Sequence, residues 1–262
     1  MKKIISLAMC LILLLSLCAC GKSEEAKAVE EKIASIGEVT LEKTDTIKEV
    51  NSAYNALDSK DKEQVENTNV LRDAMYSSLV MRYSEMNNHS SILAAGVARV
   101  WNEVGAQDFW SSFQCVLYFK DEHSVQQLKT MRALSSDDPD DWKIIVWGAG
   151  CALDKETYYL SKHPDTDEEI AVVVDMAMPI GHAYDILPEM EETLYSDVTQ
   201  FIKDYKEEMP EECELLREWS LESSSFADFA MEPSGNLNDY QAKLSEYEST
   251  MSRYEREADM MK

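Results

Sequence analysis

The sequence predicts an all-α fold: a small N-terminal three-helix module, then an elongated bundle of long antiparallel helices with a C-terminal coiled-coil-like hairpin. Two observations carry this prediction. The 262 residues contain only eight Gly and six Pro, whereas strand-rich folds need many turns built from these residues. Apolar residues make up 45% of the chain, and they recur at three- and four-residue steps, which is the spacing of one helical face.

The first 25 residues have the pattern of a targeting segment. Lys2 and Lys3 give a positive start, and an almost uninterrupted apolar run follows from Ile4 to Leu17. A basic start, a short apolar core and small residues at a cleavage site are typical of a secretory signal. The run is shorter than the roughly 20 apolar residues that a membrane-spanning helix needs. We therefore expect a cleaved signal peptide.

The end of this run, Leu17-Cys18-Ala19-Cys20, resembles the lipobox of bacterial lipoproteins of the Gram-positive type. In that family a peptidase cuts before the cysteine, and lipid is attached to the cysteine thiol. The resemblance implies cleavage directed by Leu17, Cys18 and Ala19, lipidation of Cys20, and a location on the extracytoplasmic face of the cell membrane. Two acyl chains anchor a protein durably where one does not. Ordinary secretion, with Cys20 a spectator, is the alternative.

Residues 31–80 are expected to form the small module, after a lipidated, charged tether at residues 20–30. Ile33 and Ile36 share one helical face, Gly37 can cap that helix, and Val39 with Leu41 can fill the core across the turn. The pattern resembles three-helix modules of Gram-positive cell-surface proteins, and it is carried by Ile33, Ile36-Gly37, Val39-Thr40-Leu41, Ile47, Ala53-Tyr54, Ala56-Leu57, Lys62, Val65 and Leu71. The resemblance implies an architecture and no activity.

Residues 81–262 are expected to form the elongated bundle. Its first part is predicted to consist of long helices. One begins near Asn69 and is ended or broken by Gly105, and a second runs from about Phe109 to Leu134. The latter is apolar around much of its first half, as expected at the centre of a bundle. Residues 135–141 are a predicted loop. For residues 142–160 a short strand remains an alternative, although a helix fits their neighbours better.

The C-terminal part is the most periodic. Residues 179–181 should break or kink one helix, and the stretch 188–231 would form a rod of about 65 Å, kinked or restarted at Pro210. After a turn at 232–235, Asn236 can cap a last helix that folds back as an antiparallel hairpin. Its heptad is Tyr240, Leu244, Tyr247, Met251, Tyr254, Ala258 and Met261. This hairpin resembles uncharacterised helical lipoproteins of Gram-positive bacteria.

The sequence contains no recognisable catalytic or metal-binding motif. None of the four histidines, which are His89, His123, His163 and His182, belongs to a zinc or di-metal motif. The acidic loops lack the glycine and glutamate of a helix-loop-helix calcium site. We predict no enzyme activity, no cofactor and no metal. A site assembled from scattered carboxylates remains the weakest of the hypotheses.

Three cysteines remain if Cys20 carries lipid: Cys115, Cys151 and Cys213. Three cannot all pair within the chain, and their neighbours are apolar. Small buried hydrophobes are therefore favoured over a disulfide framework, and their fate stays open.

The formal net charge is −25, which repels nucleic acid and anionic lipid. The leading functional expectation is an anchored, non-catalytic lipoprotein that acts as a helical protein-interaction or envelope scaffold module. Its expected partners are the membrane, through the lipid, and other envelope proteins. The alternative is a small-ligand receptor with a helical pocket lined by Trp101, Trp110 and Phe113, although aromatic residues at helical spacing are more often core.

Overall fold

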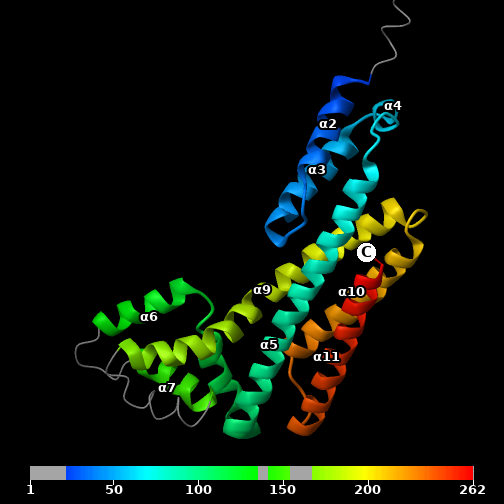
Figure 1. Ribbon diagram of the computed structural model, residues 1–262. Coiled ribbons are helices and arrows are strands. Elements are labelled where there is room, and N and C mark those ends of the chain that lie inside the picture. Colours follow the sequence, from blue (N-terminus) through cyan, green and yellow to red (C-terminus); the bar gives the residue numbers. More distant parts are fainter. Residues whose placement is uncertain (1–21, 135–140, 154–166, 262) are drawn as a thin grey trace, which may run out of the picture. The chain divides into compact units, whose positions relative to one another are not determined.

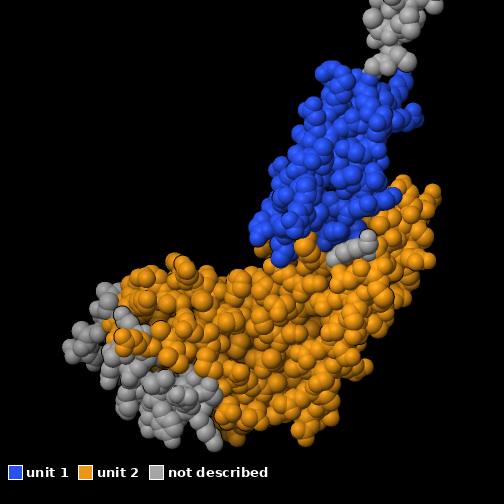
Figure 2. Space-filling view, in the orientation of Figure 1, with its two compact units in different colours: residues 1–78 blue, residues 79–262 orange. Residues whose placement is uncertain are grey.

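The structure is a computed structural model that describes residues 22–134, 141–153 and 167–261. Within these ranges every regular element is a helix (Figure 1), so the predicted all-α fold is confirmed. The chain divides into two compact units, residues 1–78 and 79–262 (Figure 2). The signal peptide predicted for residues 1–19 and the loop predicted at residues 135–140 lie outside the described ranges.

In the described part of the first unit, the short helical elements α2 (Glu24–Ser35), η1 (Leu41–Lys43), α3 (Thr44–Ala56) and α4 (Ser59–Lys62) precede the start of a longer helix. Helix α2 begins at Glu24, within the tether predicted at residues 20–30. It begins there because Ser23 Oγ accepts a hydrogen bond from the Ala26 N–H at 3.0 Å, which satisfies one of the free donors at a helix start. Glycine at position 37 takes φ +61° just after the helix.

A small aliphatic core holds this unit together. Its buried residues are Ala26, Val29, Ile33, Ile36, Ile47, Val50, Val65, Leu71 and Ala74. The expected face of Ile33 and Ile36 is thus buried, and Val39 packs against the same core. Leu41 is 38% exposed, so its predicted place in the core is wrong. It lies in η1, a single tight turn that is too short to bury a whole face.

Helix α5 (Thr68–Leu117) is interrupted at Gly105, whose φ of 74° and ψ of 174° are not helical. This confirms the predicted break. The helix expected from Phe109 to Leu134 is two helices instead, because α5 ends at Leu117 and α6 (Glu122–Leu134) begins anew. The cause is a reciprocal cap: Asp121 Oδ1 accepts from the Ser124 N–H at 2.6 Å, and Ser124 Oγ accepts from the Asp121 N–H at 3.2 Å.

Residues 142–153 lie in helix α7 (Asp141–Leu153), so the helix expected there is confirmed and the strand is wrong. Residues 154–160 lie outside the described ranges. Helix α9 (Asp167–Tyr205) continues through Pro179 and Pro188, so the break expected at 179–181 does not occur. Proline in a helix interior loses one hydrogen bond. Pro179 faces solvent, and burial of its neighbours Ala177, Ile180 and Ala183 at 5% exposure or less offsets that loss.

The chain reverses between α9 and α10 (Pro210–Met231), and these two helices pack against each other (Figure 1). The rod predicted for residues 188–231 is therefore wrong. Pro210 has no N–H to donate and suits the first position of a new helix. Helix α11 (Leu237–Met260) then packs on α10. Asn236 Oδ1 accepts from the Asp239 N–H at 3.1 Å, so both the hairpin and its predicted cap are confirmed.

Candidate functional site

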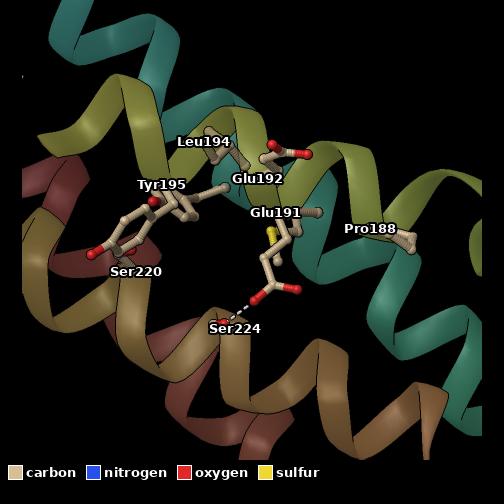
Figure 3. A pocket seen from close by; sticks show the side chains of 9 residues that line it. Pro188, Glu191, Glu192, Leu194, Tyr195, Ser220 and Ser224 are labelled. Carbon is tan, nitrogen blue, oxygen red and sulfur yellow. Dashed lines mark hydrogen bonds between the residues drawn. The ribbon is translucent and has the colours of Figure 1, made fainter. Parts of the chain in front are cut away.

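A pocket of about 270 Å³ opens among α5, α9 and α10 in the second unit (Figure 3). Helix α9 contributes most of its wall, α5 its floor and α10 two serines. The lining residues are Tyr83, Met86, Pro188, Glu191, Glu192, Leu194, Tyr195, Ser220 and Ser224. Small-molecule sites are typically concave and mostly apolar with a few polar groups, and this lining has that composition.

Tyr83 is the most unusual residue of the pocket. Its side chain is 1% exposed, and its ring stacks on Trp219 with the centroids 5.6 Å apart. Its hydroxyl makes no hydrogen bond within the described residues, although Ser220 lies near enough to lower the pKa of Tyr83. Burial raises the pKa of Tyr83 to about 12 against these smaller effects, because a phenolate would be poorly solvated there. A buried, unpartnered hydroxyl is costly.

Carboxylate and hydroxyl groups also line the pocket. Glu191 points from α9 toward α10, where its carboxylate accepts a hydrogen bond from Ser224 Oγ (Figure 3). Tyr195 lies one turn further along α9 and is 64% exposed. The lining of the pocket therefore includes a carboxylate, hydroxyl groups and an aromatic ring.

An ion pair fastens two of the pocket helices. Arg82 Nη1 on α5 lies 2.5 Å from Asp197 Oδ2 on α9, with side chains 12% and 28% exposed. These residues neighbour pocket residues in sequence, although neither lines the cavity. The pair fixes the spacing of α5 and α9, because charge-assisted hydrogen bonds are shorter and stronger than neutral ones.

Trp101, Trp110 and Phe113, for which a pocket lining was the alternative to core packing, do not line this pocket. Trp101 packs on Phe109 at 5.3 Å and on Tyr240 of α11 at 5.9 Å, and Phe109 stacks on Phe113 at 5.2 Å between ring centroids. Phe113 is fully buried, while Trp110 is 52% exposed. These rings pack against one another, and none of them lines the described pocket.

The predicted lipidation site, Cys20, and its cleavage signal, Leu17 to Ala19, lie outside the described residues. Sequence reasoning also missed Tyr83 and Tyr195. A signal for Tyr83 existed, because it falls between Leu79 and Met86 at helical spacing. Tyr195 directly follows the buried stripe residue Leu194, and a single aromatic beside such a stripe carries no local signal.

Helix α7 presents a second candidate site. One side is buried, with Trp142, Val146 and Ala149 at 5% exposure or less. The other side carries Ile144 and Trp147, which are 57% and 47% exposed. These two are three residues apart and therefore neighbours on one helical face. We call this pair the α7 apolar face. A helix that is apolar all round is normally buried on all sides.

Two further findings concern membranes and metals. Of the described helices, α9 alone has a stretch, Ile170–Tyr205, whose length and apolar character suit a membrane span; buried core helices share these properties. In the same ranges, no group of three or more His, Cys, Asp or Glu side chains could hold a metal ion.

Comparisons of the chain with protein-family models, with curated proteins and with solved structures gave no match.

Proposed function

We propose that this protein is a lipid-anchored extracytoplasmic lipoprotein that binds other envelope proteins through its helices and performs no catalysis. The anchor rests on the lipobox resemblance at Cys20. The observation that supports binding is the α7 apolar face, on which Ile144 and Trp147 remain 57% and 47% exposed. Tryptophan is among the residues that contribute most to protein interfaces.

The chemistry of this face indicates what kind of partner would fit it. An apolar patch on a chain of net charge −25 suits a partner whose contact area is apolar at the centre and which carries positive charge around it, because complementary charges steer association. The net charge of −25 disfavours anionic lipid and nucleic acid. A protein of the envelope is therefore the partner class we propose.

In-cell photo-crosslinking of the full-length, lipidated protein tests this proposal. A photoreactive phenylalanine analogue replaces Trp147 in one variant and Glu246, an exposed residue of α11, in the control. We expect a specific crosslinked protein from position 147 that is absent from position 246. Identical products from both positions, or none from position 147, would contradict the interaction role.

The anchor is tested in the same cells with Cys20→Ala. The variant should be lost from the membrane fraction and should lose its crosslinked partner. If the protein still partitions with membranes after its signal is cleaved, the lipidation proposal fails while the α7 result stands independently.

The pocket supports a second candidate function, which is binding of a small ligand. The specific observation is Tyr83, which lines the cavity and whose buried hydroxyl makes no hydrogen bond within the described residues. A ligand with an acceptor for this hydroxyl and an ammonium group for Glu191 and the Tyr195 ring would satisfy all three groups. Choline has both features and is a suitable first probe.

Choline titration followed by NMR chemical shifts tests the pocket, with Tyr83→Phe and Tyr240→Phe as a matched pair. Both substitutions remove a buried hydroxyl without a hydrogen bond, but only Tyr83 lines the pocket. We expect Tyr83→Phe to weaken binding about tenfold, as loss of one hydrogen bond does, and Tyr240→Phe to leave it unchanged. Equal affinities of the two variants would exclude a role for the Tyr83 hydroxyl.

A further inference from the structure

Cys115 of α5 lies against Gly148 of α7, three residues before Cys151. Both thiols are free and half-buried. A side-chain carbon built on Gly148 of α7 would lie only 2.5 Å from Cys115 Sγ and 3.1 Å from Cys115 Cβ. Because glycine has no such carbon, the Cys115 sulfur can rest directly on the α7 backbone.

Cys151 lies three residues after Gly148, so the two positions are neighbours on one face of α7. Helical side chains lean toward the turn that precedes them, which for Cys151 is the turn that contains Gly148. Both cysteine side chains therefore approach the same glycine from two helices, and Gly148 places no side chain between them. In agreement, Cys115 acts electrostatically on Cys151, although burial is the larger cause of its raised pKa.

The third thiol has a different setting. Cys213 is 4% exposed on α10, and burial raises its pKa to about 11. It has the character of the small buried hydrophobe that the sequence predicts for all three cysteines. Cys115 and Cys151 differ from Cys213, because they are only half-buried and lie on different helices on either side of Gly148.

We propose that Cys115 and Cys151 are a dithiol that is oxidised to a disulfide, which would tie α5 to α7. The oxidant is a disulfide donor, either a low-molecular-weight disulfide or the active-site disulfide of a thiol oxidase. The thiolate of one cysteine attacks the donor and releases one donor thiol, and the second thiolate attacks the mixed disulfide and releases the other. The two cysteines lose two protons and two electrons, and the donor is reduced to two thiols.

This inference does not depend on the proposed function, although α7 also carries the apolar face. The cross-link would fix the helix that presents Ile144 and Trp147. Because the reaction needs only the folded chain and a disulfide donor, it can be tested separately from any partner.

The test uses the full chain in membrane fractions. The protein is reduced, treated with oxidised glutathione under native conditions, alkylated and mapped by peptide mass spectrometry. We expect one linked peptide pair, Cys115 with Cys151, that has lost two hydrogen atoms, and an alkylated Cys213. The variants Cys115→Ser and Cys151→Ser should each abolish the link and leave a mixed disulfide with glutathione on the remaining thiol.

Cys213→Ser is the matched control and should cross-link like the parent protein. Three results would overturn the proposal: glutathione adducts on both cysteines without a link, a link that includes Cys213, or no reaction at Cys115 and Cys151 while the chain is folded. A Cys115–Cys151 link that forms only after denaturation would also overturn the proposal, because the folded chain would then not have reacted.

Discussion

The α10–α11 hairpin and helix α7 are both rich in aromatic residues, but they use them in opposite ways. In the hairpin the rings pair across the two helices: Trp219 stacks on Tyr254 with centroids 6.1 Å apart, and Phe226 stacks on Tyr247 at 4.9 Å. In α7, Trp142 is buried while Trp147 is 47% exposed. An apolar stripe confined to one face commits a helix to its neighbours, whereas a helix that is apolar on both faces keeps one available for a partner.

Trp219→Ala is the variant with the largest expected effect, and it tests whether the paired rings of the hairpin stabilise the fold. Trp219 is fully buried, and its ring lies between Tyr83 at 5.6 Å and Tyr254 at 6.1 Å. Truncation of a buried tryptophan leaves a cavity, so we expect the free energy of unfolding to fall by about 3–5 kcal/mol. Urea denaturation followed by circular dichroism measures it. Leu221→Ala, at a residue of α10 that is 56% exposed, is the control and should cost much less.

Alkaline pH probes the buried rings that flank the hairpin. Burial raises the pKa of Tyr83 from 10.0 to about 12, so the unfolded chain loses this proton at lower pH than the folded chain. Stability should therefore decrease as pH rises from 10 through 12, by at most about 2–3 kcal/mol for this group. Tyr83→Phe should flatten that decrease in denaturation curves collected across the range. Superimposable curves for the variant and the parent would mean that the hydroxyl is solvated in the folded state.

The hairpin turn offers a smaller effect. Asn236 accepts a hydrogen bond from the Asp239 N–H at 3.1 Å, and loss of such a cap costs about 1 kcal/mol. Asn236→Ala should lower stability by this amount, and Asn236→Asp should preserve most of it. The comparison is made by thermal unfolding of the three proteins, and equal losses for Ala and Asp would show that the cap contributes little.

The smallest expected effect on stability belongs to the α7 apolar face. Trp147→Lys removes a ring that is already half in water, so the free energy of unfolding should change by no more than about 0.5 kcal/mol. The same substitution should abolish the crosslink that a photoreactive residue forms when it is placed at position 144, the other residue of the face. A large loss of stability would place Trp147 with the packed rings of the hairpin and remove the contrast on which the proposed function rests.

Local patterns predicted those features that depend on a few neighbouring residues: the all-α fold, the break at Gly105, the hairpin and its cap at Asn236. They failed where distant packing decided the outcome. The apolar residues Leu194, Phe201 and Leu216 continue at helical spacing through residues 206–209, where the chain turns back. The spacing of apolar residues therefore could not reveal that turn. At Pro179, burial of the neighbours outweighed the lost hydrogen bond.

The candidate sites were harder to predict for a related reason. The pocket draws Tyr83, Glu191 and Ser224 from three helices, and nothing local in the sequence brings them together. For Trp101 and Phe113 core packing was favoured over a pocket lining, and both contact other rings, as aromatic side chains at helical spacing usually do. Cys115 and Cys151 each looked inert alone; their pairing depends on Gly148.

At Gly105, where α5 is interrupted, the chirality of a replacement residue matters more than the size of its side chain. A side-chain carbon on Gly105 would meet no atom within 4 Å, yet the backbone there has φ +74° and ψ 174°. An L-alanine would strain this backbone by about 1–3 kcal/mol, whereas D-alanine adopts it as the mirror image of ordinary extended chain. A semisynthetic protein with D-alanine at this position should therefore fold as well as the parent, and its L-isomer should not.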